Sequence, residues 1–585
     1  EHHQGAKHGQ APKPDSAART GAVELLEDGR IEELAALLDS AGGSHTTAEV
    51  LNKFAAQHNR QRSAQSIADI RYEIRWEKSA SASSAKSQDD ALWLIAGDGA
   101  DVAPLVDALI AGGRRHRVVG LPASPADEER LVDELRAAVR DESAVRILHV
   151  AALDSEPSSM KSLLRMQHRV LGGTQRLFRA AAAADLRGSV WVVTRGAQRV
   201  TEADAVAPEQ SSLWGFCRAA ALEYPQVWGG LADLSSDGAD EWPTLLGHIP
   251  AASPGEDQFA LRGPAVHVPR LVRRTGQPNP EQLQLRSDAT YLVTGGLGSI
   301  GLEIAGYLAA HGARQLVLTS RRAPDDAAQA RIDAMCDQHG CTVRAITADV
   351  ADPHDVARLL AEVQAELPPL AGVIHAAGEN STTPLSSLDG EELDRVFAGK
   401  VWGAWHLSEA IADLGLDFFL STSSISAVWG SFGQSAYSAA NAFLDGLTWR
   451  LRERGVPGIS VNFGPWSAGM ADADARAQLE LRGVHTLSPA DALAGMADVM
   501  VAAGSGTPNA RETASRWSGF LPVYLQAGRR ALLDEMSREV PASAVPAAPG
   551  PRPALALRAP GRAGGGVGAR PGAGRPRARW PRGTG

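Results

Sequence analysis

Hydrophobic and polar positions along the chain form two long series of strand and helix patterns. In the first series, helical stretches separate five short apolar runs between residues 92 and 234: "LWLIAG", "RVVGL", "VRILHVAAL", "SVWVVT" and "GGLADL". Short apolar runs that alternate with helices are typical of a parallel sheet with helices on both faces. The stretch "IRYEIRW", residues 70–76, alternates polar and apolar positions and predicts a strand ahead of this series.

The second series begins near residue 290, after the strand-like "VHVPRLVR" and the polar "TGQPNPEQLQ", which mark a boundary. We therefore predict an α/β protein with two doubly wound parallel-sheet subdomains, at residues 68–278 and 285–532. Residues 1–60 are expected to form a linker with short helices. Residues 540–585 are rich in Pro, Ala, Gly and Arg without periodicity, which predicts a disordered tail.

Composition narrows the class of protein. The 585 residues exceed what one core usually organises, and 44% hydrophobic with 22% charged residues indicates a globular chain. A net charge of −10 argues against a nucleic-acid surface. Three irregularly spaced cysteines give neither a disulfide framework nor zinc-ligand spacing, and no apolar run approaches the roughly 18 residues of a membrane span. We expect a cytoplasmic protein without metal, membrane or nucleic acid.

The two series differ in their glycine-rich turns. The first turn, "GDGADVA", has Val102 where a third glycine would enter the helix, so this half is predicted to be structural. The second lies in "TYLVTGGLGSIGLEIAGYLAAHGARQLVLTSRR", which reads strand, turn, helix, strand. Its glycines, Gly295, Gly296, Gly298 and Gly301, would let a pyrophosphate approach the amides at the helix start. This pattern predicts a Rossmann-like dinucleotide site.

The end of the next strand points to the form of the dinucleotide. An NAD site would normally place an acidic residue there, whereas this chain has Ser320, Arg321 and Arg322. Guanidinium groups bind a phosphate through charge-assisted hydrogen bonds, so NADPH is predicted over NADH. Farther along, Asp349 lies at a strand end where it could contact the adenine. Gly378 of "GVIHAAG" lies where a flat loop could run beside the nicotinamide ribose.

A candidate catalytic group lies in "FFLSTSSISAVWGSFGQSAYSAANAF", residues 418–443. Ser424 follows a strand, and Tyr437 and Asn441 are four residues apart and so share one helix face. A phenol that protonates an alkoxide benefits from a nearby ammonium, which stabilises the phenolate and lowers its pKa. The motif itself contains no lysine, so the cation must come from elsewhere in the chain.

Residues 70–530 resemble the ketoreductase domain of a modular type I polyketide synthase, a member of the short-chain dehydrogenase/reductase superfamily. The matching segments are "TGGLGSIG", "HAAG", "FAGKVWGAWHL", "SSISAVWGSFGQSAYSAANAFLDGL" and "NFGPWSAGMA". The resemblance implies that Lys400 supplies the missing ammonium, beside Ser424, Tyr437 and Asn441, and that the first half is a truncated structural subdomain. The implied cofactor contacts are Thr294, Gly295, Gly296, Gly298, Ser299, Ile300, Gly301, Ser320, Arg321, Arg322, Asp349, Val350, Ala376, Ala377, Gly378 and Lys400.

The resemblance also implies a reaction and its partners. A 3-ketoacyl intermediate, carried on the phosphopantetheine of an acyl carrier protein, would be reduced by NADPH to a 3-hydroxyacyl thioester, with neighbouring synthase domains as further partners. Trp429, eight residues before the tyrosine, and the lack of Leu-Asp-Asp in "ENSTTPL" resemble the A-type class, which gives the L-hydroxyl. Residues 470–487 resemble a substrate lid. The substrate-side set is Trp429, Gln434, Gly464, Pro465, Trp466 and Met470.

Two alternatives remain at this point. A degenerate reductase could serve as a non-catalytic cofactor-binding or scaffold domain of the synthase. A self-contained metabolic reductase acting on free ketones is a third reading, although the large first half would then have no evident purpose. NADPH oxidation with a 3-ketoacyl thioester separates the catalytic reading from the scaffold.

Overall fold

The structure is a computed structural model. It describes residues 64, 66–79, 90–97, 102–153, 157–237, 240–253, 255–467, 484–503, 509–512, 514–515 and 531–533. The predicted linker at 1–60 and tail at 540–585 lie outside these residues, as do Met470 and most of the predicted lid.

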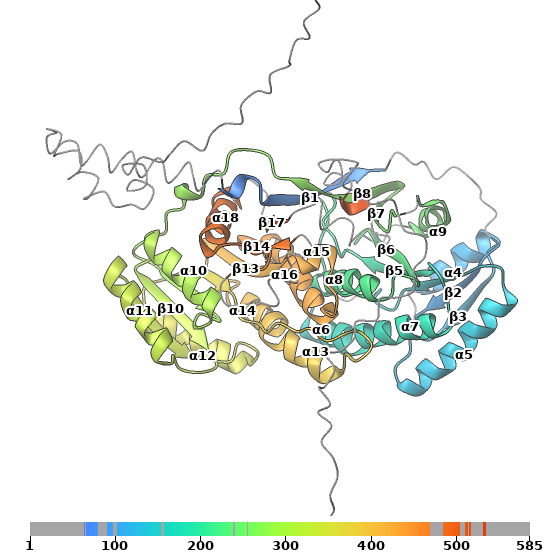
Figure 1. The fold of residues 1–585 in the computed structure, drawn as a ribbon, viewed down its shortest axis with the longest axis horizontal. Helices are drawn as coiled ribbons and strands as arrows, with labels where there is room; N and C mark the ends of the chain where they lie inside the picture. Colours follow the sequence, from blue (N-terminus) through green and yellow to red (C-terminus); the bar gives the residue numbers. More distant parts are fainter. Residues whose placement is uncertain are drawn as a thin grey trace, which may run out of the picture. The chain divides into compact units, whose positions relative to one another are not determined.

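Among the described residues, one 15-stranded sheet contains two sets of parallel strands, one in each half of the chain (Figure 1). In the first half the spatial order is β3 (His116–Val119), β2 (Leu92–Ala96), β4 (Val145–His149), β5 (Val190–Arg195), β6 (Trp228–Leu234) and β7 (Gln258–Arg262). In the second half it is β11 (Thr342–Thr347), β10 (Gln315–Ser320), β9 (Thr290–Thr294), β12 (Leu370–His375), β13 (Phe418–Ser424) and β14 (Gly458–Phe463).

The strand order of the second half reverses between β9 and β12. The chain starts at β9, builds β10 and β11 on one side, and then crosses to β12 on the other. Ligands of such sheets bind at the carboxyl ends of the strands where the order reverses, here between β9 and β12. The first half reverses between β2 and β4 but has only β3 on the outer side among the described residues. The prediction of two doubly wound subdomains, the first truncated, is confirmed.

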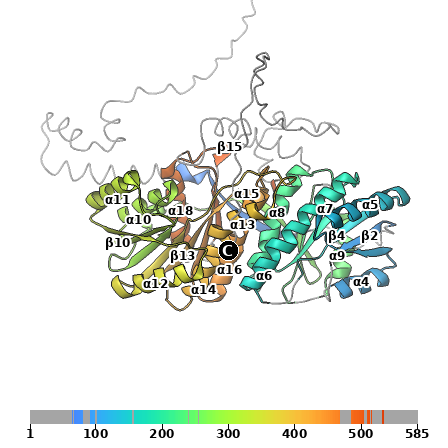
Figure 2. The same cartoon turned by 90° about the horizontal axis from the view of Figure 1, so that it is seen from below.

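Helices cover both faces of the sheet (Figures 1 and 2). The helices of the first half are α4 (Val102–Ala111), α5 (Pro125–Asp141), α6 (Met160–Arg165), the π-helical η1 (Met166–Leu171), α7 (Gly172–Ala183), α8 (Pro208–Glu223) and α9 (Trp242–Ala251). Those of the second half are α10 (Ser299–Ala310), α11 (Asp326–His339), α12 (Pro353–Glu366), α13 (Gly390–Phe397), the π-helical η3 (Ala398–Trp402), α14 (Gly403–Ala410), α15 (Ser426–Trp429), α16 (Ser435–Glu453) and α18 (Pro489–Ala502). Short elements are η2 (Pro280–Gln282), η5 (Ala531–Leu533) and the pair β15 (Val484–His485) and β17 (Ala514–Ser515).

Three strands join the two halves. β8 (Ala265–Arg273) runs antiparallel to β7, β1 (Arg71–Lys78) runs antiparallel to β8, and β16 (Asn509–Glu512) lies between β1 and β14. The strand predicted at residues 70–76 is therefore confirmed as β1. The strands β7 and β16 were not predicted, because such short segments carry no clear period of their own.

The two halves also pack through α8 and α16, which lie side by side in both views (Figures 1 and 2). A Cβ placed on Gly215 of α8 would come within 2.2 Å of the Ser438 carbonyl oxygen of α16. Only glycine permits so close an approach of the two backbones. The catalytic helix predicted around Tyr437 therefore lies directly against the first half.

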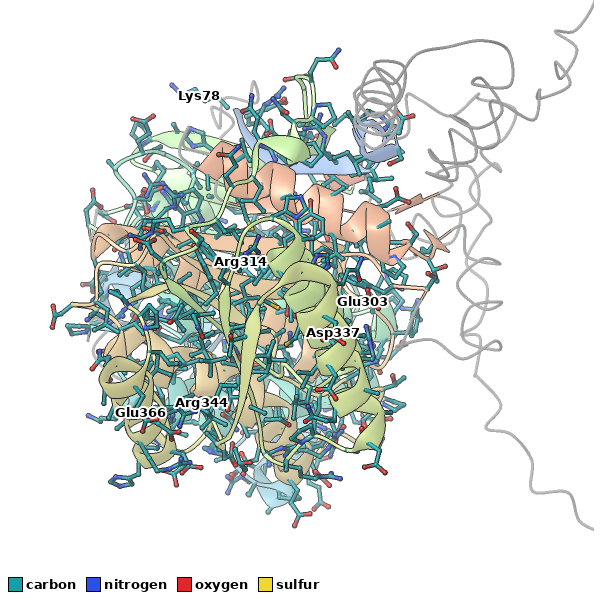
Figure 3. The ribbon with its side chains drawn as sticks, turned by 90° about the vertical axis from the view of Figure 1, so that its left-hand side faces the viewer. Lys78, Glu303, Arg314, Asp337, Arg344 and Glu366 are labelled. Atoms are coloured by element: carbon teal, nitrogen blue, oxygen red, sulfur yellow. The ribbon has the colours of Figure 1, made fainter. Side chains whose placement is uncertain are left out.

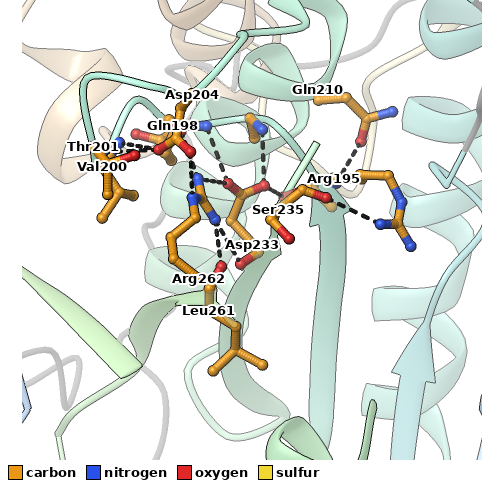
Figure 4. A network of polar contacts seen from close by, with 12 residues as sticks. Arg195, Gln198, Val200, Thr201, Asp204, Gln210, Asp233, Ser235, Leu261 and Arg262 are labelled. Atoms are coloured by element: carbon orange, nitrogen blue, oxygen red, sulfur yellow. Dashed lines mark hydrogen bonds and ion pairs between the residues drawn. The ribbon is translucent and has the colours of Figure 1, made fainter. Parts of the chain in front are cut away.

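Charged side chains lie at the carboxyl ends of the strands of the first half (Figure 4). Asp233, at the end of β6, is fully buried and accepts hydrogen bonds from Thr194 at 2.8 Å and from Arg262 at 2.9 Å. Arg262 also binds Asp204 at 2.8 Å. Burial raises the pKa of Asp233, and the Arg262 guanidinium opposes that rise. The strands of the second half run opposite to those of the first, so this network lies at the other edge of the sheet from the carboxyl ends of β9 and β12.

The edge of the sheet in the second half is also charged (Figure 3). Arg344 on the edge strand β11 binds Glu362 and Glu366 of α12 at 2.7 and 2.5 Å. Charges on an edge strand oppose pairing with another chain. In the described part of the chain, no helix is long and apolar enough to cross a bilayer.

Candidate active site

The glycine-rich turn after β9 is shaped by close backbone contacts. Gly295 has a φ of +64°, and a Cβ there would lie 2.7 Å from the Ala376 carbonyl oxygen. A Cβ on Gly301 would lie 2.2 Å from the Gly295 carbonyl oxygen. The turn thus requires glycine at these two positions, and it leaves the start of α10 beside the carboxyl end of β12.

The start of α10 has the features of an anion site. Its N-cap is Gly298, which offers no side-chain hydrogen bond, and its first turn contains no acidic residue. The first amides of a helix are unpaired within the helix and carry the positive end of its dipole. The predicted contacts Ser299, Ile300 and Gly301 supply these amides, so the turn fits the pyrophosphate of a dinucleotide.

The predicted adenosine contacts lie at neighbouring strand ends. Ser320 ends β10, and the exposed Arg321 and Arg322 follow it. Arg321 binds Glu379, which follows β12, at 2.7 Å, and this ion pair reaches over the end of β9 that lies between them. A phosphate bound by Arg321 would have to displace the Glu379 carboxylate or bind the guanidinium together with it. The sequence pattern did not reveal this competition.

Two further predicted contacts follow β11. The Asp349 carboxylate accepts a hydrogen bond from the Ala351 amide at 3.0 Å, while its own amide donates to Asp355. Val350 is buried against Gly403. Both residues lie at the carboxyl edge of the sheet, as the sequence predicts.

The loop after β12 contacts Lys400 directly. A Cβ on Gly378 would come within 2.9 Å of Lys400 Cε, so a larger residue would displace the lysine. His375, which ends β12, was not predicted as a site residue. Its Nδ1 accepts from Thr294 Oγ1 at 2.8 Å, and its Nε2 donates to the Lys400 carbonyl at 3.0 Å. Burial lowers the pKa of His375 to about 4, with the Lys400 charge acting in the same direction, so the ring is neutral.

Lys400 lies in the π-helical turn η3, where one residue is inserted into the helix. Its side chain is buried, and Nζ donates to the Thr422 carbonyl at 2.9 Å. The same Nζ lies 5.6 Å from the centre of the Tyr437 ring. The structure therefore brings together the two groups that are 37 positions apart in the chain and on which the catalytic hypothesis depends.

Burial dominates the electrostatics of this pair. It lowers the pKa of Lys400 to about 8, although the Asp445 carboxylate opposes the shift. It raises the pKa of Tyr437, and the polar groups of Asn441 and Ser424 oppose this rise. The expectation that the lysine charge would hold the pKa of the phenol below its usual value is therefore wrong for the structure as it stands, since loss of solvent outweighs the neighbouring groups.

Ser424 and Asn441 complete the predicted set. Ser424 ends β13, and its Oγ accepts a hydrogen bond from the Ser426 amide at 3.2 Å. Asn441 donates from Nδ2 to the Tyr437 carbonyl at 2.8 Å, while its Oδ1 is buried without a partner among the described residues. A buried acceptor without a partner is costly, so this atom is available to a lysine, water or ligand donor.

The substrate-side residues divide into buried and accessible ones. Trp429 is 4% exposed and packs with Leu222, Ile425 and Val428 in one hydrophobic cluster. Any effect of Trp429 on a substrate therefore acts through packing and the backbone of α15. By contrast, Gln434 is accessible and donates from Nε2 to Asn380 Oδ1 at 3.0 Å.

The last predicted segment follows β14. Gly464 leads to Pro465, whose carbonyl accepts the Leu487 amide at 2.7 Å. Trp466 is buried, and its ring lies edge-on to Phe463 at 5.3 Å between the ring centres. Among the described residues, no group of acidic, histidine or cysteine side chains has the arrangement of a metal site.

Comparison with known proteins gives two family matches. Residues 289–468 match the family described as "KR domain", and residues 74–271 match "Polyketide synthase extender module SpnB, Rossmann fold domain". Among solved structures, "Structure of A1-type ketoreductase" is 31% identical with a TM-score of 0.71, covering 82% of this chain and 100% of that one. "The first ketoreductase of the tylosin PKS" is 30% identical with a TM-score of 0.67, covering 81% and 99%.

Curated relatives are much longer proteins. "Pikromycin polyketide synthase component PikAIII" of Streptomyces venezuelae is 31% identical over 543 residues, which is 91% of this chain and 33% of that protein. "Polyketide synthase GfsA" of Streptomyces halstedii is 32% identical over 444 residues, 75% of this chain and 6% of that protein. The chain thus spans a third or less of the length of these two relatives.

Proposed function

The chain belongs to the ketoreductase domains of modular polyketide synthases, and on that premise we propose that it reduces the 3-keto group of a carrier-bound intermediate. The substrate would be a 3-ketoacyl thioester on the phosphopantetheine of an acyl carrier protein, and the product a 3-hydroxyacyl thioester. Neighbouring synthase domains would be the other partners. The observation that carries the proposal is the approach of Lys400 Nζ to the Tyr437 ring at 5.6 Å, beside the glycine-rich turn.

The two halves would divide the work. Residues 285–532 would form the catalytic subdomain and residues 68–278 the structural one. Ketoreductase domains of this family use a nicotinamide cofactor, and we propose NADPH for this chain. When bound, the cofactor supplies a hydride equivalent to the ketone carbon. The amides of Ser299, Ile300 and Gly301 would bind its pyrophosphate, and Arg321 with Arg322 its 2'-phosphate.

The remaining groups act on the ketone oxygen. Ser424 Oγ and Tyr437 Oη would donate hydrogen bonds to this oxygen, whose negative charge grows in the transition state. The raised pKa of Tyr437 keeps the phenol protonated, as a proton donor requires. Lys400 has two donors left after its bond to Thr422, and these would stabilise the phenolate once the proton has left. Asn441 Oδ1 would accept a hydrogen bond from Lys400 or from a relay water.

The proposal is tested by offering the chain a 3-ketoacyl thioester of N-acetylcysteamine as substrate. NADPH oxidation measures the rate of reduction, and chiral analysis identifies the product. We expect turnover and an L-configured 3-hydroxyl, because Trp429 precedes Tyr437 by eight residues and Leu-Asp-Asp is absent after the HAAG loop. Two of the similar structures are titled A1-type and A-type, which supports this assignment. A D-hydroxyl product would contradict the A-type assignment, and NADPH binding without turnover would favour the scaffold alternative.

Replacing both arginines after β10 should weaken the binding of NADPH but not that of NADH. In Arg321→Ala/Arg322→Ala, the KM for NADPH should rise roughly tenfold, as expected for the loss of exposed charge-assisted hydrogen bonds to a phosphate. The KM for NADH should stay the same, since NADH lacks the 2'-phosphate. Steady-state kinetics with both cofactors measure this.

Arg331→Ala is the matched control for this pair. It removes an exposed arginine that binds Glu303 on α10, and it should change neither constant. Equal KM values for NADPH and NADH in the unmodified protein would contradict the assignment of the phosphate site.

A further inference from the structure

One carboxylate of the first half reaches two loops of the second half. Glu223 is the last residue of α8, and its Oε2 accepts the Leu385 amide at 2.7 Å while its Oε1 accepts the Gly433 amide at 3.1 Å. Leu385 belongs to residues 379–389 after β12, and Gly433 to residues 430–434 before α16; we call these segments loop A and loop B. A single side chain therefore fixes the position of loop A relative to loop B.

A second helix of the first half, α7, also binds loop A. Gln175 of α7 donates from Nε2 to the carbonyls of Leu385 and Leu388, both at 2.6 Å. The Leu385 residue thus has both its amide and its carbonyl bound to side chains of the first half. Arg218 of α8 similarly donates to the Ala427 carbonyl at 2.8 Å, in α15 ahead of loop B.

The two loops also contact each other. Gln434 Nε2 binds Asn380 Oδ1 at 3.0 Å, and a Cβ on Gly433 would lie 3.4 Å from Thr382 Cγ2. Loop A begins directly after Gly378, which packs on Lys400, and loop B ends three residues before Tyr437. The spacing of the loops is therefore linked to the surroundings of both groups that would act on the ketone.

We propose that Glu223 is a positioning residue that sets the spacing of loops A and B and, through it, the face of the ketone presented to the cofactor. This inference rests on the proposed function and assigns the first half a part in substrate control. The carboxylate suits this role because it can accept two amides at once in charge-assisted hydrogen bonds. Its loss leaves two amides of the loops without their acceptor, so the loops would lose their common support.

The test compares Glu223→Gln with Glu453→Gln in the full chain. Glu453, on α16, also crosses the interface between the halves and accepts one amide, that of Val206, at 3.2 Å, but it touches neither loop. Each variant is assayed with a 2-methyl-3-ketoacyl thioester of N-acetylcysteamine for kcat, KM and the ratio of hydroxy epimers. NADPH affinity is measured separately by fluorescence titration, and thermal unfolding reports on stability.

For Glu223→Gln, we expect the KM for the thioester and the fraction of the minor epimer each to rise roughly tenfold, which corresponds to the loss of one charge-assisted hydrogen bond. NADPH affinity should not change. Glu453→Gln should alter neither the KM nor the epimer ratio. Should Glu223→Gln fail to fold, Gln175→Met releases loop A alone and should change the same two quantities in the same direction.

A purely structural role predicts a different result. If Glu223→Gln unfolds at a lower temperature but keeps the wild-type KM and epimer ratio, the inference is overturned while the proposed function stands. If both glutamate variants change the epimer ratio equally, the effect belongs to the interface in general and the inference is again overturned. If the unmodified chain reduces no ketoacyl thioester, the proposed function fails and this inference fails with it.

Discussion

Tyr437→Phe is expected to lower kcat for ketone reduction by about 100- to 10,000-fold, the usual contribution of a positioned general acid. The substitution removes one oxygen and leaves the ring, so the packing of α16 against α8 should be kept. Only the proton donor and one hydrogen bond to the ketone oxygen are lost. NADPH affinity should therefore remain the same, which can be checked by fluorescence titration beside the kinetic assay.

Tyr307→Phe is the control for this substitution. Tyr307 lies on α10 in the same half, and its ring stacks on His311 with 4.0 Å between the ring centres. Loss of its hydroxyl should leave kcat unchanged. Near-normal reduction by Tyr437→Phe would refute the assignment of the acid and with it the proposed mechanism.

Lys400→Met should lower kcat at neutral pH by about 100-fold or more, on the scale of other charge-stabilising groups in active sites. It should also change the pH profile. The pKa of Lys400 is about 8 because the group is buried, so the ammonium loses its proton as the pH rises through this value. In the unmodified chain kcat/KM should therefore fall above about pH 8, and in Lys400→Met this fall should be absent.

The same group links stability to pH with a definite sign. Between about pH 8, the pKa of Lys400 in the folded chain, and 10.5, the ordinary pKa of a lysine, the unfolded chain binds up to one proton more than the folded chain at this position. The contribution of Lys400 to the free energy of unfolding thus rises with pH across this window, by roughly 3 kcal/mol in total. Denaturant titrations of both proteins at pH 8 and pH 10 should show a smaller change with pH in Lys400→Met.

Lys78→Met serves as the control for the lysine. Lys78 is an exposed residue of β1, remote in the chain from the turn η3, and its loss should leave the kinetic profile and the pH dependence of stability unchanged. A wild-type profile in Lys400→Met would show that another group provides the charge.

Much of the fold follows from local pattern, and the remainder depends on contacts distant in sequence. The buried runs of β9, β12 and β13 and the glycines after β9 are readable because period and turn chemistry are local. The shared helix face of Tyr437 and Asn441 is local as well. Lys400 could be placed only by resemblance, since nothing in the period of its helix signals the π-helical turn that carries it.

Other features of the site escaped the sequence for the same reason. His375 is one polar residue at the end of an apolar strand, and its bond to the Lys400 carbonyl joins positions 25 apart. The pairing of Arg321 with Glu379 links two strand ends that are separated by β9. The rise in the pKa of Tyr437 depends on how completely the surrounding elements exclude water, which local sequence does not specify.

The strands that join the two halves in one sheet have a consequence for engineering. β16 comes from the end of the second half, yet it lies between β14 and β1, and β1 precedes the first half in the chain. A graft that transplanted only the second half into another synthase would separate β16 from β1 and expose the edge of β16 that pairs with β1. The transferable unit therefore runs from β1 through β16, and a working chimera would need its crossover points outside both strands.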